Sequence, residues 1–248
     1  MSILTDKLRR TVALAGLPLS VQRVIRKVRR ERLTYLSTGK LISLAWLCRS
    51  LDRRHIEGVI VETGCALGGS ALVVAAAKSP ARPLAIYDVF AMIPPPSDND
   101  GADVAKRYDL IRSGRSPGIG GDTYYGYQSN LYEKVRDTFE RAGYPPVEHH
   151  VSLVKGMIED TLHVEGPVAL AHIDLDWYEP VLTSLERIVP HLSAGGVIVL
   201  DDYLDWSGCR KATDQYFDSR RDAFTFDLSS GAMVIRKSGP GDVAGSEA

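Results

Sequence analysis

The stretch GVIVETGCALGGSALVVAAAK, residues 58–78, decides the fold. It begins with a short apolar run, passes through a turn with three glycines, and continues with small apolar residues that favour a helix. A strand that leads into a helix through a glycine-rich turn is typical of a parallel α/β sheet. The free N–H groups at the start of such a helix favour an anionic or carboxylate group. We therefore expect a ligand-binding turn at Gly64, Gly68 and Gly69.

Strand-like runs and helical segments alternate through the rest of the chain. The further strands are predicted at 83–89, 147–156, 168–176 and 195–203, and the further helices at 130–143, 178–192 and 209–222. Two β-like runs, AFTFDLSS and GAMVIRK (223–237), predict a closing hairpin. Continuous apolar runs such as 197–200 indicate strands that are buried on both faces. The pattern predicts a doubly wound α/β sandwich with antiparallel pairing near one edge.

Composition excludes several classes of protein. The 248 residues are 44% hydrophobic and carry 30 Lys and Arg against 31 Asp and Glu, so no basic excess points to nucleic acid as a partner. Cys48, Cys65 and Cys209 lie far apart, which predicts neither a disulfide framework nor a zinc site and favours a reducing, cytoplasmic setting. The N-terminus has no signal-peptide pattern, and no stretch approaches the ~20 apolar residues of a membrane span. We expect no stable membrane insertion.

Residues 1–50 are predicted to form an N-terminal helical extension. Val21, Val24, Ile25 and Val28 form an apolar stripe on a helix over 21–33. Its other face is basic, with Arg23, Arg26, Lys27, Arg29, Arg30 and Arg32. Such a helix binds a membrane surface or an anion, or it packs on the domain or on a second subunit with its basic face in water. The stripe has no Trp or Phe, which favours packing, and a homo-oligomer through these helices is one form of it.

The main domain is predicted over residues 51–238, followed by a tail at 239–248 that has no core formers and is expected to be disordered. Residues 91–128 interrupt the alternation, because they are rich in Pro, Gly and Asp and have little periodicity. A long loop without regular structure is usually a lid or a disordered insert. Tyr124, Tyr125 and Tyr127 favour a lid-like insert over the site.

The ligand of the glycine turn is indicated by its spacing and by the acid that follows. Asp88 ends the next strand, where nucleoside-binding sheets place the acid that hydrogen-bonds the ribose. The glycines run G-x-x-x-G-G, which differs from the G-x-G-x-x-G of dinucleotide sites. This spacing disfavours NAD and leaves a smaller adenosyl cofactor. An ordinary glycine turn with a strand-ending acid is the alternative interpretation.

Two apolar runs end on acids, in AHIDLDWYEP (171–180) and VIVLDDYLDW (197–206). If the two strands are neighbours, Asp174 meets Asp201 and Asp202 at one edge of the sheet, because neighbouring strands lie about 4.8 Å apart. Three close carboxylates repel one another unless a cation neutralises them or a pKa rises, and oxygen ligands suit Mg²⁺. Asp201 and Asp202 can share one ion only if their strand ends there. Alternatively, the acids cap the following helices.

With these motifs together, the chain resembles the class I S-adenosylmethionine-dependent methyltransferases. More narrowly, residues 57–237 resemble the macrocin-type (TylF/MycF) O-methyltransferases, which modify hydroxyls of natural products, often on sugars. The resemblance rests on VIVETGCALGGSA, IYDVF, VKGMIEDTL, AHIDLDWYEPVLTSLE and GGVIVLDDYLDWSGCRKATDQYF. It implies a Rossmann-like methyltransferase sandwich whose mostly parallel seven-stranded sheet carries an antiparallel edge hairpin. It also implies S-adenosylmethionine and Mg²⁺ as cofactors.

The resemblance assigns roles to individual residues. The loop 62–70 would hold the methionine part of the cofactor, through Glu62, Thr63, Gly64, Gly68 and Ser70. Asp88 would hold the ribose, while Gly156 and Met157 would lie along the adenine. Asp174, Asp201 and Asp202 would bind the metal, with Asp174 also beside the cofactor and the expected catalytic base. Related catechol-type enzymes have a lysine where this chain has Trp177, so we expect no lysine base.

Other side chains near the acids have simpler interpretations. His172 shares a strand face with Asp174, but it lies in an apolar run and is expected to be a core histidine. His149 and His150 precede a strand and are expected at the opposite edge. Trp177 and Tyr203 follow the acids and either form a wall of the substrate pocket or belong to the core.

The sequence thus predicts a Mg²⁺-dependent O-methyltransferase that acts on a hydroxyl of a small natural product or sugar moiety. A nicotinamide-dependent oxidoreductase is the enzyme alternative. A non-catalytic cofactor-binding scaffold that docks through its basic N-terminal helix is the other alternative.

Overall fold

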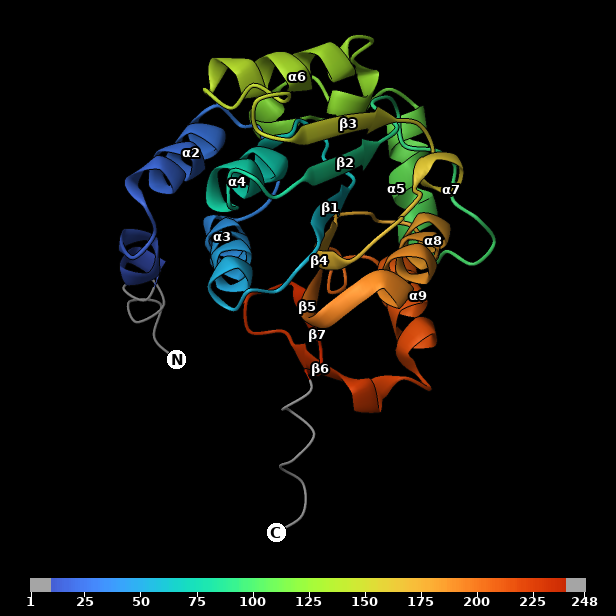
Figure 1. Ribbon diagram of the computed structural model, residues 1–248. Coiled ribbons are helices and arrows are strands. Elements are labelled where there is room, and N and C mark those ends of the chain that lie inside the picture. The colour runs from blue at the N-terminus through green and yellow to red at the C-terminus, as the bar shows by residue number, and fades with distance from the viewer. Residues whose placement is uncertain (1–9, 240–248) are drawn as a thin grey trace.

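A seven-stranded sheet runs through the centre of the molecule in the order β3-β2-β1-β4-β5-β7-β6 (Figure 1). The computed structural model describes residues 10–239. Its strands are β1 Val59–Thr63, β2 Leu84–Asp88, β3 Val151–Lys155, β4 Val168–Ile173, β5 Leu192–Leu200, β6 Phe224–Asp227 and β7 Met233–Lys237. The first five strands are parallel, and β7 pairs antiparallel with both β5 and β6. The predicted fold class, with its antiparallel edge hairpin, is confirmed.

Helices cover both faces of the sheet (Figure 1). One face packs against α2 Leu19–Arg30, α3 Thr38–Arg53, α4 Gly69–Ala77 and α6 Leu131–Arg141. The other packs against α7 Ile158–Thr161, α8 Tyr178–Ile188 and α9 Ser207–Phe217. The two apolar clusters that result are separated by the sheet, so β4, whose six residues are all buried, contributes side chains to both.

The carboxyl ends of β1, β2, β4 and β5 meet at one edge of the sheet. The connections after β1 and β4 leave toward opposite faces, because α4 belongs to one apolar cluster and α8 to the other. Such a switch point leaves a crevice where ligands bind in open α/β sheets. Both predicted motifs, the glycine turn after β1 and the acids after β4 and β5, therefore lie at the same edge.

The N-terminal helices pack on the domain. The predicted stripe of Val21, Val24, Ile25 and Val28 is buried in the apolar cluster that also contains α3 and α4. Packing on the domain is therefore the interpretation that the structure bears out for the stripe. The helix begins and ends earlier than predicted, at Leu19 and Arg30, and the predicted boundary at residue 50 falls inside α3.

The insert 91–128 has more regular structure than its sequence suggests. It contains α5, Ala102–Arg112, and two short 3₁₀ turns at Ile119–Gly121 and Tyr125–Tyr127. The expectation of a loop without regular structure was wrong for α5. This helix buries only Val104 and Ile111, which stand seven residues apart, so its apolar pattern is too sparse to recognise.

Two further predictions concern the chain ends and membranes. Residues 240–248 of the predicted tail lie outside the described residues. Within residues 10–239, no helix is both long and apolar enough to cross a bilayer.

Candidate functional site

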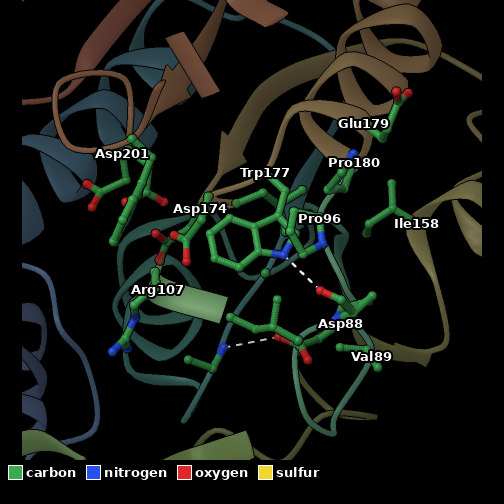
Figure 2. A pocket seen from close by; sticks show the side chains of 18 of the residues that line it. Asp88, Val89, Pro96, Arg107, Ile158, Asp174, Trp177, Glu179, Pro180 and Asp201 are labelled. Carbon is green, nitrogen blue, oxygen red and sulfur yellow. Dashed lines mark hydrogen bonds between the residues drawn. The ribbon is translucent and has the colours of Figure 1, made fainter. Parts of the chain in front are cut away.

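A cavity of about 590 Å³ lies at the carboxyl edge of the sheet (Figure 2). A volume of this size suits a cofactor or a small molecule. Of the predicted residues, its walls include Gly64, Asp88, Gly156, Met157, Asp174, Asp201 and Asp202. The structure therefore brings the proposed adenosyl site and the proposed metal site into one cavity.

The turn after β1 can be built only with glycine at its first position. Gly64 has a φ of +81°, and a Cβ there would overlap the carbonyl oxygen of Asp174. L-residues with side chains avoid this backbone region, and the contact leaves no room for one. The glycine turn and the acid strand β4 thus lie in direct backbone contact, which places the predicted cofactor loop beside the predicted base.

Asp88 fastens this turn to the end of β2. Its Oδ2 accepts hydrogen bonds from the backbone N–H groups of Cys65 and Ala66 at 2.8 and 3.1 Å, and its Oδ1 accepts one from Phe90 at 2.6 Å. A carboxylate offers about four acceptor positions, so roughly one position on Oδ1 is left for a ribose hydroxyl. Burial raises the pKa of Asp88, and the three amides act against that rise.

Four of the predicted cofactor residues lie in the glycine turn or directly behind it. Glu62, Thr63, Gly68 and Ser70 are buried, and in the described part of the chain they lie behind the cavity wall. Ser70 Oγ donates to Glu62 Oε1 at 2.6 Å, and His172 Nδ1 is 3.0 Å from the same oxygen. Their contact with the cofactor stays a prediction, and the bonds that the structure shows hold α4 to β1 and β4.

His172 is a buried partner of Glu62. Burial lowers the pKa of His172, and the hydrogen bond and charge of Glu62 raise it to about 9. With a proton on Nδ1, the imidazole donates to Glu62 Oε1. His172 belongs to the interior of the protein, as predicted, where its contact with Glu62 joins β4 to β1.

Gly156 and Met157 form another part of the cavity wall, after β3. Gly156 has a φ of +151°, a Cβ there would meet the Thr161 side chain at 2.5 Å, and its N–H donates to the Asp88 carbonyl at 3.0 Å. The segment is thereby held against the end of β2, and its contact with the adenine stays a prediction.

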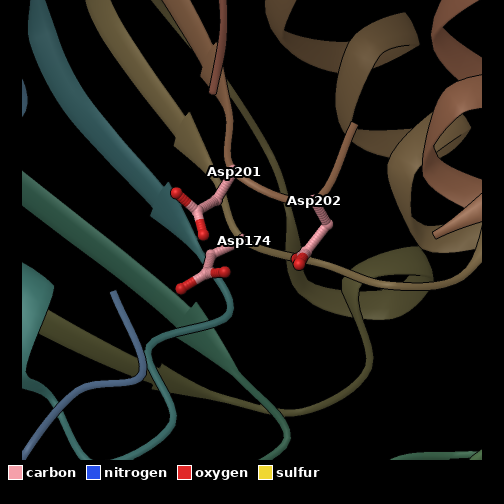
Figure 3. A group of neighbouring side chains, drawn as sticks. All are labelled: Asp174, Asp201 and Asp202. Atoms are coloured by element: carbon pink, nitrogen blue, oxygen red, sulfur yellow. The ribbon is translucent and has the colours of Figure 1, made fainter. Parts of the chain in front are cut away.

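The three predicted metal ligands converge (Figure 3). One oxygen of each of Asp174, Asp201 and Asp202 lies within 4.8 Å of the others. β4 and β5 are parallel neighbours, and β5 ends at Leu200, so Asp201 and Asp202 stand in a turn. They are thereby free of the alternation that would send their side chains to opposite faces. The condition stated in the sequence analysis, that the strand must end before Asp201 and Asp202 can share one ion, is met.

The charge of the cluster is compensated only in part, by Lys40, whose ammonium lies 3.0 Å from Asp201 Oδ2. Burial, followed by the charge of Asp201, raises the pKa of Asp174 well above its ordinary value. Burial, followed by the charges of Asp176 and Asp174, does the same for the pKa of Asp202. Asp201 Oδ1 and Asp202 Oδ2 are buried without a hydrogen-bond partner among residues 10–239. Oxygen donors alone, close together and partly unpaired, fit a hard cation such as Mg²⁺.

Among the charged residues of the cavity wall, several received no assigned role from the sequence, including Asp176, Lys40 and Arg107. Asp176 lies two residues after Asp174, and burial raises its pKa to about 6 against a hydrogen bond with Asp202. Lys40 reaches the cavity from α3, and Arg107 reaches it from α5, where its guanidinium lies over the Tyr124 ring. Asp176 belongs to the quoted acidic motif and was recognisable there, whereas no local pattern marks the two cations.

The insert 91–128 forms a wall of the cavity. Pro94, Tyr124 and Tyr125 line it, and the Trp177 indole N–H donates to the Pro94 carbonyl at 2.9 Å (Figure 2). Asp100 accepts from the Tyr178 backbone N–H at 2.8 Å. The insert is thus tied to the segment that follows β4. Whether it moves as a lid stays a prediction.

The aromatic residues and histidines named in the sequence analysis lie either in the cavity wall or away from the cavity. Trp177 is part of the cavity wall. Tyr203 donates from its hydroxyl to Asp214 on α9 at 2.8 Å. His149 and His150 directly precede β3, at the opposite edge of the sheet from the acids.

Comparisons with known proteins point in one direction. The profile of the family described as Macrocin-O-methyltransferase (TylF) matches residues 32–227. A tetracenomycin 4'-O-methyltransferase from Streptomyces olivaceus, which acts on a dimethoxy-rhamnosyl compound by its name, is 28% identical over 74% of this chain and 67% of its own. Demethyldecarbamoylnovobiocin O-methyltransferase from Streptomyces niveus is 26% identical over 78% of this chain and 72% of its own. The solved structure of the O-methyltransferase NovP superposes with a TM-score of 0.68 at 22% identity, covering 83% of this chain and 82% of that one.

The strand order, with a glycine turn beside the switch point, gives the same fold as the solved methyltransferase. The family match identifies the chain as an S-adenosylmethionine-dependent O-methyltransferase. The profile match covers most of the sequence. The chain belongs to the macrocin-O-methyltransferase (TylF) family. The predicted resemblance and the predicted enzyme class are confirmed, and the family and the named relatives are methyltransferases, not nicotinamide oxidoreductases.

Proposed function

We propose that this enzyme methylates a hydroxyl group of a small natural product or of a sugar attached to one, with the help of Mg²⁺ held by Asp174, Asp201 and Asp202. The acceptor would enter the cavity beside the acids, with S-adenosylmethionine over the glycine turn. Asp174 would take the proton of the reacting hydroxyl.

The observation that carries this proposal is the position of the three acids. Their oxygens lie within 4.8 Å of one another, and two of the oxygens are buried and unpaired within the described part of the chain. The same cavity wall contains Gly64, in backbone contact with Asp174. A methyl donor on the turn would therefore lie next to a site for an oxygen nucleophile.

When bound there, Mg²⁺ makes a coordinated hydroxyl more acidic, so that a carboxylate can accept its proton near neutral pH. Asp174 is suited to this role, because it follows β4 directly and its N–H is fixed by a 2.9 Å hydrogen bond to the Thr63 carbonyl. The insert and the buried Trp177 ring form this side of the cavity wall. Fixed neighbours of this kind supply much of the rate through orientation.

The class of acceptor is supported by the relatives and by the walls. The two named relatives act on a rhamnosyl tetracenomycin and on a novobiocin precursor. Aromatic residues and prolines line the cavity on the side of the insert, including Tyr35, Tyr124, Tyr125, Trp177, Trp206, Pro94, Pro95 and Pro96. Flat apolar side chains of this kind suit the faces of sugar rings and aromatic aglycones.

The test is methyl transfer from labelled S-adenosylmethionine to a panel of rhamnosides and phenolic glycosides, with chelator and with added Mg²⁺. We expect turnover that chelator abolishes and Mg²⁺ restores. D201N and D202N should lose it while they still bind S-adenosylhomocysteine. D109N is the matched control, because Asp109 is an exposed acid of α5 paired with Arg112. Full activity in chelator would refute the metal site and leave the acids as caps.

A further inference from the structure

Lys40 brings a positive charge from the N-terminal helices into the acid cluster. Its ammonium donates to Asp201 Oδ2 and to the Asp201 carbonyl, both at 3.0 Å, and lies 3.6 Å from Asp205 Oδ2. The Lys40 side chain is only 15% exposed and that of Asp201 8%. This ion pair joins residues 161 positions apart and is one of the walls of the cavity.

The position of Lys40 is set by the start of α3. Ser37 caps the helix and its Oγ accepts the backbone N–H of Lys40 at 3.2 Å. The neighbouring Leu41 and Leu44 are buried in the core, which fixes the face that Lys40 presents. The backbone of Lys40 is therefore fixed by the fold, and the two hydrogen bonds to Asp201 order its ammonium.

The two oxygens of Asp201 differ in their surroundings. Oδ2 is bound by Lys40, whereas Oδ1 is buried without a partner in the described chain, on the carboxylate that faces Asp174 (Figure 3). The Asp201 carboxylate thus offers one oxygen to the Lys40 ammonium and the other to the proposed metal site. A divalent ion on Oδ1 and an ammonium on Oδ2 repel each other across a few ångströms of poorly hydrated protein.

We propose that Lys40 is the built-in counter-cation of the acid cluster and sets its affinity for the divalent ion. Without a metal, it offsets part of the repulsion among Asp174, Asp201 and Asp202. With a metal, its charge weakens binding and keeps it reversible. Lys40 acts through Asp201, so it is a positioning residue. This inference rests on the proposed metal site.

Two variants separate the charge of Lys40 from its size. K40M keeps the length of the side chain and removes the charge, whereas K40R keeps the charge. K27M is the matched control, because Lys27 pairs with Glu31 within the N-terminal helical region, away from the cavity. The full-length protein is titrated with Mn²⁺ in the presence of S-adenosylhomocysteine, and its Tm is measured without metal and with Mg²⁺.

We expect K40M to bind Mn²⁺ about ten-fold more tightly than the wild type, since a nearby like charge is removed. Its metal-free Tm should fall, and Mg²⁺ should raise that Tm by more than in the wild type. K40R and K27M should bind Mn²⁺ within about two-fold of the wild type, because the charge in the cluster is unchanged.

Two results would overturn the inference, and they differ. Unchanged or weaker Mn²⁺ binding by K40M, beside clear binding by the wild type, would refute the role of Lys40 and leave the metal site intact. Absence of binding in both proteins would refute the metal site itself. If K40M fails to fold even with Mg²⁺, the smaller K40Q variant is titrated in the same way.

Discussion

The two halves of the cavity floor satisfy their polar groups in opposite ways. On the side of β1 and β2, Asp88 accepts three backbone hydrogen bonds and the turn is closed by its own residues. On the side of β4 and β5, Asp201 and Asp202 each keep a buried oxygen that finds no partner within residues 10–239. In the first half only Glu62 Oε2, behind the turn, is a buried oxygen without a partner among residues 10–239, and it does not face the cavity, whereas the two unpaired oxygens of the second half belong to residues of the cavity wall. The second half therefore has the composition of a site completed by a ligand.

Because of this difference, we expect the two halves to depend on metal ions to different degrees. A preformed half should contribute to binding and stability whether or not a metal is present. A half whose carboxylates are compensated only in part should contribute to catalysis, and its behaviour should change with cations. Substitutions on the two sides should therefore change different measured quantities.

The largest effect should come from D174N. It removes the proposed base and a metal ligand together, so kcat should fall by about 10²–10⁴-fold, the range for loss of an acid–base group. The affinity for S-adenosylhomocysteine should stay nearly unchanged, because the proposed adenosyl pocket lies over β1 to β3. Steady-state kinetics and calorimetry measure the two quantities. Activity retained in D174N would assign the base to another group.

Next in size is the loss of stability in G64A. The alanine must adopt a positive φ, at roughly 1–2 kcal/mol, and must clear the Asp174 carbonyl, which adds about 1–3 kcal/mol. Denaturant unfolding measures the total. G114A is the matched control, since Gly114 has a φ of +75° and no atom within 4 Å of the position that an alanine Cβ would take. Equal losses of unfolding free energy in both variants would mean that the backbone near Asp174 can move aside for the alanine Cβ at little cost.

A smaller effect is expected from D88A on cofactor affinity. It removes an acceptor for the ribose and releases the amides of Cys65 and Ala66, so binding of S-adenosylhomocysteine should weaken by roughly 1.5–3 kcal/mol. Calorimetry measures this change. D227A serves as the control, because Asp227 also accepts a backbone N–H, from Ser229, but in the distant hairpin. Undiminished affinity in D88A would remove Asp88 from the site.

The smallest expected effect is a change in hydrogen exchange of the insert, which forms a wall of the cavity beside both halves. If residues 91–128 close over the cavity, their amides should gain protection from hydrogen exchange when S-adenosylhomocysteine and an acceptor bind. The hydrogen bond from Trp177 to Pro94 gives the closed position its anchor. Equal protection with and without ligands would make the insert a static wall.

Much of this arrangement was predictable because it follows from local patterns. The alternation of strands and helices predicted a parallel sheet, and parallel strands bring their carboxyl ends to one edge. Asp174, Asp201 and Asp202 therefore converge as expected. The hairpin at 223–237 was equally clear, because its two runs flank a short polar turn.

The rest depended on contacts between distant parts of the chain. Lys40 and Asp201 are 161 residues apart, and nothing near either residue announces the pair. The helix α5 buries two side chains and is otherwise polar, so only its tertiary position reveals it. Glu62 was assigned to the cofactor by resemblance, whereas its partners Ser70 and His172 lie behind the turn.

The packing of α2 has a practical consequence for where this protein can be cut. The family profile begins at residue 32, which suggests a natural start for a shortened enzyme. Yet Val21, Val24, Ile25 and Val28 are at most 5% exposed, and they cover α4, the helix that follows the cofactor turn. A chain started at residue 32 would present that surface to water, and apolar patches of this kind promote self-association. A shortened enzyme that stays monodisperse in solution therefore has to start before Leu19. This requirement comes from the packing of α2 and not from the residues that take part in the reaction.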